Sequence, residues 1–181
     1  MSSVVMPKSE VSMLRWVWLS VVVIVLDQLT KYWADSQLQL YLPQQVVTGF
    51  NLTLSYNPGA AFSFLADAGG WQRWFFVVLA LGVATFIVGW LMRLTQNERW
   101  MAIALTLILG GAVGNVIDRA YFGHVIDFIQ VFYVADSCLP LFSQGGSGCY
   151  FPTFNIADSA ICIGAVMMVI DSLRGHKKAA S

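Results

Sequence analysis

Charged residues are scarce in this chain: Asp, Glu, Lys and Arg make up 11% of its 181 residues, whereas 57% are hydrophobic. The mean hydropathy is positive, and an ordinary soluble domain carries about twice that share of charged residues. The 10 acidic and 10 basic residues cancel, so there is no basic surplus of the kind that favours nucleic-acid binding. The composition therefore predicts a protein that lies largely in lipid.

Long apolar runs make up much of the chain. Crossing a hydrocarbon core of about 30 Å takes roughly 20 helical residues, and four runs fit that length, at about residues 13–33, 74–92, 100–122 and 155–173. We expect the first run to be retained as a helix, because it is longer than the apolar region of a cleaved signal peptide. The predicted fold is a single domain over residues 1–181, of the membrane class and mainly α.

Lysine and arginine are absent from residues 34–72 and 120–154. Seven of the 10 basic residues lie at the opposite ends of the apolar runs: Lys8, Arg15, Arg93, Arg99, Arg174, Lys177 and Lys178. Positively charged flanks tend to stay in the cytoplasm. We therefore expect both termini to be cytoplasmic and the segments 34–73 and 123–154 to face outward.

Histidine and cysteine are also rare. The two histidines, His124 and His176, lie far apart, and no His-Glu-x-x-His run exists, so we expect no metal site and no zinc peptidase. Of the three cysteines, Cys138 and Cys149 flank the outward stretch 139–148, within a segment, residues 136–149, that we call the insert. An oxidising compartment would permit them to pair, but their spacing alone leaves the disulfide open.

The outward segments contain strand signals. Apolar and polar residues alternate over 50–56, which is typical of a half-buried strand with Asn51 and Thr53 on its polar face. A second strand is predicted over 124–133, which is rich in Val, Ile, Phe and Tyr. After a turn signal, the apolar residues 60–65 are expected to form a short interfacial helix. We predict a small extracytoplasmic β platform with this helix beside it.

Polar side chains gather near the outward ends of three runs. Positions three or four apart share one side of a helix, so each run carries one polar stripe. The stripes are Asp27 and Lys31 on the first run, Asn115, Asp118 and Arg119 on the third, and Asn155 and Asp158 on the fourth. Because lipid cannot satisfy such groups, we expect the stripes to face one another. Small residues permit close approach of helices, and the third run offers Gly110, Gly111 and Gly114.

Asp127 and Asp158 stand in strongly apolar surroundings, where an ionised carboxylate is costly unless a partner or a chemical task compensates for it. Two carboxylates held close together share one proton, so that one can act as a general base and the other as a general acid. Their titration belongs to the pair. The residues alone leave open whether these aspartates are catalytic or serve as buried hydrogen-bonding groups between helices.

Five motifs occur in order along the chain: LDQLTK at 26–31, YNPGAAFS at 56–63, GGAVGNVIDR at 110–119, VIDF at 125–128 and FNIADSA at 154–160. Together with the four-run topology, they resemble the sequence boxes of bacterial lipoprotein signal peptidase, also called signal peptidase II. Any one of these motifs would be weak evidence. The ordered set covers nearly the whole chain and is specific.

The resemblance implies an aspartic endopeptidase of the bacterial inner membrane, facing the periplasm, that cuts diacylglyceryl-modified prolipoproteins just before the lipidated cysteine. It implies inhibition by globomycin, and we expect a monomer without a cofactor. The catalytic pair maps onto Asp127 and Asp158, and a structural role onto Asp27 and Lys31. The substrate-binding positions that the resemblance implies are Asn57, Gly59, Asn115, Arg119 and Asn155.

Several alternatives stay open. Arg119 could pair with Asp118 or hold a substrate carbonyl, and the family resemblance favours the second. Asn155 could orient Asp158 or hydrogen-bond substrate rather than merely cap the last helix, although an asparagine at the start of a helix can do both. Residues 60–64 could pack at the membrane surface or cover the substrate. The rival functions are a small transporter with a polar relay through the membrane and a lipid-binding assembly subunit. A transporter would need polar residues at all depths, whereas the inward halves of the runs are almost wholly apolar.

Overall fold

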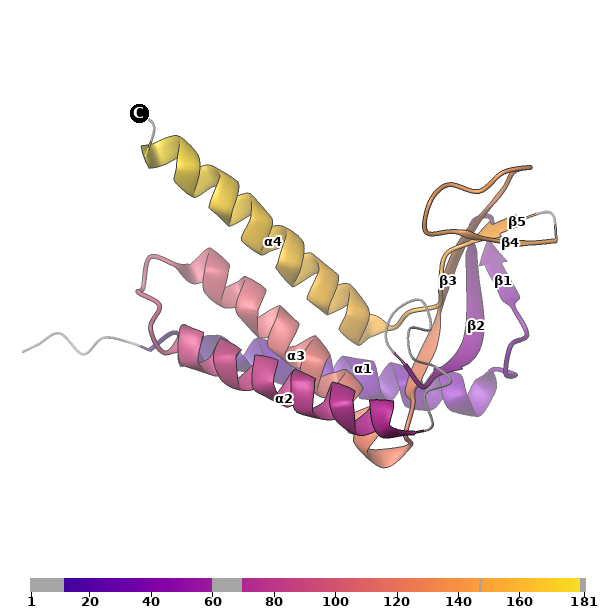
Figure 1. Cartoon of the computed structure of the whole chain (residues 1–181), viewed down its shortest axis with the longest axis horizontal. Helices are drawn as coiled ribbons and strands as arrows, with labels where there is room; N and C mark the ends of the chain where they lie inside the picture. The colour runs from indigo at the N-terminus through magenta and orange to yellow at the C-terminus, as the bar shows by residue number, and fades with distance from the viewer. Residues whose placement is uncertain (1–11, 60–69, 147, 180–181) are drawn as a thin grey trace, which may run out of the picture.

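The computed structural model describes residues 12–59, 70–146 and 148–179, with side chains as far as Arg174. Within these ranges the chain forms four long helices, α1 Val17–Gln37, α2 Trp71–Leu91, α3 Arg99–Tyr121 and α4 Ile156–Ala179, with a 3-10 turn, η1 Met13–Trp16, before α1. All four are long and apolar enough to cross a membrane (Figure 1). Four helices lie where the apolar runs predicted spans, and the first continues to Gln37 rather than ending at residue 33.

Helix α3 is the centre of the bundle. Half of its apolar window is buried inside the protein, against 17–22% for the other three helices. The inner core packs α3 against α2 and η1 through Met13, Ile87, Leu91, Ala102, Leu105 and Leu109. Large apolar side chains elsewhere are exposed, such as Val78 at 68% and Phe86 at 66%. These exposed side chains fit helices whose outer surfaces face lipid rather than water.

Glycines on α3 allow its neighbours to approach closely. A methyl group at Gly110 would lie 2.9 Å from the backbone of Ser20 on α1, and one at Gly111 would collide with the carbonyl of Ala157 on α4. At Gly114, a methyl group would lie 2.7 Å from a carboxylate oxygen of Asp27. The expected role of these three glycines in close helix approach is confirmed, because any Cβ atom would force the helices apart.

A five-stranded antiparallel sheet lies at the end of the bundle where α4 begins (Figure 1). Its order is β1-β2-β3-β5-β4. The strands are β1 Gln44–Val47, β2 Phe50–Asn57, β3 Val125–Val134, β4 Ser143–Gly145 and β5 Gly148–Tyr150. A second core of Ala34, Leu38, Leu54, Ile126 and Phe128 joins the end of α1 to β2 and β3. This core fixes the sheet on the bundle.

The two predicted strands are confirmed as β2 and β3, while β1, β4 and β5 were not predicted. The polar face of β2 is buried rather than open to solvent: Asn51 is 4% and Thr53 5% exposed. Both donate to Oε1 of Gln130 on β3, at 3.1 and 3.2 Å. A cross-strand polar partner therefore replaces water on this face. The interfacial helix predicted over 60–65 lies outside the described residues.

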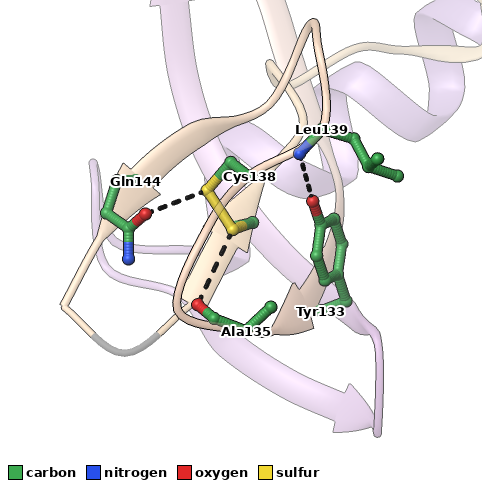
Figure 2. The surroundings of a disulfide bond; sticks show 6 residues. Tyr133, Ala135, Cys138, Leu139 and Gln144 are labelled. Carbon is green, nitrogen blue, oxygen red and sulfur yellow. Dashed lines mark hydrogen bonds between the residues drawn. A yellow bond between two sulfur atoms is a disulfide. The ribbon is translucent and has the colours of Figure 1, made fainter.

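The insert that follows β3 is closed by a disulfide. Cys138 and Cys149 are bonded, with their Cα atoms 5.4 Å apart, and Cys149 pairs with Tyr133 across β5 and β3. Figure 2 shows Gln144 and Ala135 on either side of the bridge, with the Gln144 side-chain oxygen 3.2 Å from the Cys138 sulfur and the Ala135 carbonyl oxygen 4.0 Å from the Cys149 sulfur. The Tyr133 hydroxyl accepts a hydrogen bond from the Leu139 backbone N–H. The insert is thus held against the end of the strand that carries Asp127.

We expect the purified protein to show a mass two hydrogens below that of the reduced chain, because one disulfide forms. Replacing Cys138 and Cys149 with serine should destabilise the fold by about 3 kcal/mol, the loop-entropy value for a closure of this length. Intact mass spectrometry without reductant measures the first effect, and thermal unfolding of the double variant measures the second. Free thiols at both Cys138 and Cys149 in the native protein, in addition to that of Cys162, would contradict this assignment.

Candidate active site

Asp127 and Asp158 come together because the chain is joined to β3 just before α4 begins. Phe154 exchanges backbone hydrogen bonds with Ile129, at 2.9 and 3.0 Å, two residues beyond Asp127 on the same strand. The next residue, Asn155, starts the turn into α4. The end of a strand and the first turn of a helix are therefore neighbours, although Asp127 and Asp158 are separated by the whole disulfide-closed insert.

Asn155 connects the two aspartates directly. Its Nδ2 donates to Oδ1 of Asp127 at 2.8 Å, and its Oδ1 accepts from the backbone N–H of Asp158 at 2.9 Å. Its own backbone N–H donates to Oδ2 of Asp158 at 3.2 Å. The last two bonds form a reciprocal capping box at the start of α4, so Asn155 both caps the helix and orients Asp158. Its expected contact with substrate stays a prediction.

The other oxygen of Asp127 faces the turn after β2. Nδ2 of Asn57 donates to Asp127 Oδ2 at 3.2 Å, while its Oδ1 accepts from the backbone N–H of Gly59 at 3.1 Å. Arg119 donates from Nη2 to the Gly59 carbonyl at 2.7 Å, and its guanidinium lies 5.3 Å from the centre of the Phe76 ring. Asn57, Gly59 and Arg119 therefore line one side of the pair.

Burial differs between the two carboxylates. Asp127 is 2% exposed, whereas Asp158 is only half-buried. Burial, reinforced by the negative charge of Asp158, raises the pKa of Asp127 to about 7, although hydrogen bonds from Asn57 and Asn155 and the charge of Lys31 act in the opposite direction. A carboxyl group with this pKa holds a proton at neutral pH far more readily than an ordinary aspartate does.

A second layer lies behind the pair. Nδ2 of Asn115 donates to Asp158 Oδ1 at 2.8 Å, and Asn115 Oδ1 accepts from Lys31 at 2.9 Å. Lys31 also forms ion pairs with Asp27 and Asp118, each at 2.8 Å. The shared side of Asp27 and Lys31 was expected from their spacing, but the sequence did not single out Asp118 as a second partner of Lys31. Asp118 is thus engaged by Lys31, whereas Arg119 contacts a backbone carbonyl.

The two carboxylates that pair with Lys31 also accept hydrogen bonds from the backbone of α4 and of β3, the elements that carry Asp158 and Asp127. Asp27 accepts from the backbone N–H of Ala157 at 2.9 Å, in the first turn of α4. Asp118 accepts from the backbone N–H of Ile126 at 3.1 Å, next to Asp127 on β3. The cluster therefore links α1 and α3 to both sides of the site.

Two aromatic residues, Tyr56 near the end of β2 and His124 just before β3, contact each other. The Tyr56 hydroxyl donates to Asp35 at 2.6 Å, and its ring lies 4.3 Å from that of His124. The hydrogen bond to Asp35, followed by burial, raises the pKa of Tyr56 to about 12, and burial lowers the pKa of His124. Both side chains are therefore neutral near pH 7.

In the described part of the chain, no group of three or more His, Cys, Asp or Glu side chains is arranged to hold a metal ion.

The four membrane-length helices define a multi-pass membrane protein. Where its sheet meets its helices, two carboxylates linked by one asparagine form a candidate acid–base centre. The model of the family described as signal peptidase (SPase) II matches residues 19–174. The chain belongs to this protease family, as the five motifs predicted.

Curated relatives and solved structures agree. The chain is 50% identical to the lipoprotein signal peptidase of Pseudomonas fluorescens strain Pf-5, over 91% of this chain and 90% of the relative. It is 44% identical to that of Pseudomonas syringae pathovar tomato, over 98% and 96% of the two chains. A bacterial membrane enzyme solved by the in meso method superimposes with a TM-score of 0.74 and 29% identity, covering 91% of this chain and 90% of the other. The fold class expected from the sequence is confirmed.

Proposed function

We propose that this chain is an aspartic endopeptidase that removes the signal peptide from diacylglyceryl-modified prolipoproteins, cutting just before the lipidated cysteine. The observation that carries this proposal is the contact of Asn155 with both Asp127 and Asp158. This contact joins two carboxylates from distant parts of the chain into one unit. The name of the curated relatives, lipoprotein signal peptidase, supports the substrate class.

In the proposed mechanism the two carboxyl groups hold one proton between them, so that one is protonated and the other is ionised. The elevated pKa of Asp127 makes it the acid, which hydrogen-bonds to the scissile carbonyl oxygen. Asp158, at the N-terminal end of a helix that favours negative charge, removes a proton from water. The water oxygen bonds to the carbonyl carbon and the C–N bond then breaks. The departing amine takes up a proton from the pair, which returns to its starting state.

The proposal includes the bacterial inner membrane as the location, with the sheet and the aspartate pair facing the periplasm and both termini cytoplasmic. The basic residues support this orientation, because Arg93, Arg99 and Arg174 lie at the ends of the helices remote from the sheet (Figure 1). We propose a monomer, in which one chain supplies both carboxylates and the residues around them. The lipid chains of the substrate would remain in the membrane.

The distribution of buried charge supports a peptidase over a transporter. Among the described residues, the buried charged side chains are Asp27, Lys31, Asp118 and Asp127, and all of them belong to the network near the sheet. The inner core is apolar, and the buried hydroxyls beside it, Ser20 and Thr106, donate to backbone carbonyls. A charge relay across the membrane would require ionisable groups at that depth as well.

The test is cleavage by the purified protein. Incubation with a diacylglyceryl-modified prolipoprotein should give two products, and mass spectrometry should place the cut immediately before the lipidated cysteine. The same prolipoprotein without its lipid is the matched control and should stay intact. Globomycin should block the reaction. Absence of cleavage of a substrate verified as lipidated would refute the proposed function.

The rate of cleavage should depend on pH. Because the pKa of Asp127 is raised to about 7, the singly protonated pair is present at pH 6 and is lost at higher pH. We expect kcat to fall about tenfold for each pH unit well above 7, as for any essential acid that loses its proton. A pH series of kcat with saturating lipidated substrate measures this limb. A rate that stays constant to pH 9 would contradict the assignment of Asp127 as the acid.

The same titration affects stability, which provides an independent check. A carboxyl group whose pKa is higher in the folded than in the unfolded state stabilises the fold below the unfolded value and loses that contribution as the pH rises through the folded value. For Asp127 the window runs from its ordinary 3.8 to about 7. The melting temperature of the Asp127→Asn variant should therefore increasingly exceed that of the native protein as the pH rises through this window.

A further inference from the structure

Lys31 has a property that its expected structural role does not explain: all of its hydrogen-bonding capacity is used, and one bond goes to the active-site network. The side chain is 2% exposed. Its ammonium group donates to Asp27 at 2.8 Å, to Asp118 at 2.8 Å and to Oδ1 of Asn115 at 2.9 Å. An ammonium group has three N–H donors and no acceptor. Each donor therefore has one partner.

The donor-only character of Lys31 determines which way the Asn115 amide points. An asparagine side chain has an oxygen that accepts and a nitrogen that donates, at nearly equivalent positions. Because Lys31 can only donate, the Asn115 oxygen faces it, and the Asn115 nitrogen faces Asp158 Oδ1 at 2.8 Å. In the reversed orientation, the amide N–H groups would face an ammonium and the amide oxygen a carboxylate. Both contacts would be repulsive.

The orientation of Asn115 also supports Asn155. Nδ2 of Asn155 donates to the same Asn115 oxygen at 3.2 Å. With Asn115 fixed, each oxygen of Asp158 has a donor: Asn115 Nδ2 on Oδ1 and the Asn155 backbone N–H on Oδ2. A reversed Asn115 would break the bond to Asp158 and the bond to Asn155 together. The position of the Asp158 carboxylate thus depends on a lysine that it does not touch.

We infer that Lys31 is a positioning residue of the active site, which acts through Asn115 to aim an N–H donor at Asp158 and to hold that carboxylate in place for the attacking water. This inference rests on the proposed function. Its physical basis is that a reacting group must be held within a narrow range of positions, and that the hydrogen bonds behind it supply this rigidity. Arg119 on α3 also interacts electrostatically with both carboxylates, and the two carboxylates interact with each other.

The test must remove the hydrogen bond of Lys31 without leaving two buried carboxylates unpaired, which would unfold the protein for an unrelated reason. Two double variants meet this condition, Lys31→Met/Asp118→Asn and Lys31→Gln/Asp118→Asn. Each keeps one carboxylate in the cluster and removes the ammonium, so both have the same charge and similar size. They differ in one respect, because glutamine carries an N–H donor for Asn115 and methionine does not. Asp118→Asn alone is the reference.

We expect the methionine variant to lower kcat about 30-fold relative to the reference, while KM for the lipidated substrate changes less than about threefold, since a supporting residue affects the reacting group rather than substrate binding. The glutamine variant should restore kcat to within about threefold of the reference. Melting temperatures and size-exclusion profiles measured alongside establish the folded fraction of each protein. A purely structural lysine would lower the folded fraction of both variants equally and leave kcat per folded molecule unchanged.

Equal kcat values per folded molecule for the two variants would overturn the inference, as would a loss confined to KM. The substitutions Asp127→Asn and Asp158→Asn test the proposed function separately. If these are active, the aspartic mechanism itself is wrong. If they are inactive while the methionine variant matches the reference, only the role of Lys31 is wrong. Should Asp118→Asn prevent folding, the same pair of Lys31 variants is made with Asp27→Asn, which also removes one carboxylate of the cluster.

Discussion

Replacing either Asp127 or Asp158 with asparagine is expected to lower kcat by roughly four orders of magnitude, the upper range for loss of a general acid or base. Asparagine has nearly the same shape as aspartate but can neither accept nor release a proton at neutral pH. The Asn155 bridge reaches both positions, so either substitution breaks the same unit. The measurement is cleavage of lipidated prolipoprotein over extended times, with each variant purified in the same detergent.

Asp136→Asn is the matched control for this pair. Asp136 is an exposed aspartate in the insert after β3, and its substitution makes the same chemical change away from the carboxylate pair. Native-like kcat in Asp136→Asn, together with a melting temperature no lower than the native value in all three variants, would locate the loss in the chemistry. Measurable turnover near the native rate in either Asp127→Asn or Asp158→Asn would refute the two-carboxylate mechanism.

The substitution Asn155→Ala should reduce kcat by roughly 100-fold to 1000-fold, a loss typical of removing one fixed hydrogen-bond donor from an active site. It deletes the donor to Asp127 Oδ1 and the acceptor of the Asp158 backbone N–H. It also removes the cap of α4, at a cost of about 1 kcal/mol. Steady-state kinetics and thermal unfolding, measured on the same preparation, separate these two effects.

Asn51→Ala provides the comparison for Asn155→Ala. Asn51 is likewise buried, at 4% exposed, and bonded to a polar side chain, Gln130, at 3.1 Å. Its loss should lower the melting temperature with little change in kcat, because its partner lies on the sheet and does not touch either carboxylate. If both alanine variants reduced kcat to the same degree, the loss at Asn155 would reflect general damage to the platform.

Much of this arrangement follows from simple periodicity. The four spans follow from the length of the apolar runs, and the polar stripes follow from the spacing of helical residues. Asp27 and Lys31 share a side of α1, and that side meets Asn115 of α3 as the stripes require. Lipid leaves buried polar groups only one another as partners, which makes convergence predictable in a membrane protein.

Other features depend on contacts that no local pattern records. Asp118 could have paired with the adjacent Arg119. Instead Asp118 forms an ion pair with Lys31 of α1, and Arg119 donates to the Gly59 carbonyl. The strand β5 has three residues and pairs with both β3 and β4, so its sequence is too short for a periodic signal. The polar face of β2 is buried because Gln130 lies opposite it. Each of these outcomes is decided by a partner distant in sequence.

The bond between Cys138 and Cys149 can also report the orientation of the protein in living cells. Disulfides persist in oxidising compartments and are rare in the cytosol, so the oxidation state of this pair records which side of the membrane the sheet has reached. Blocking free thiols in intact cells before lysis preserves that record without adding a tag to the protein. An oxidised pair would report a sheet outside the cytoplasm, and reduced thiols would argue against the proposed orientation of the whole catalytic end.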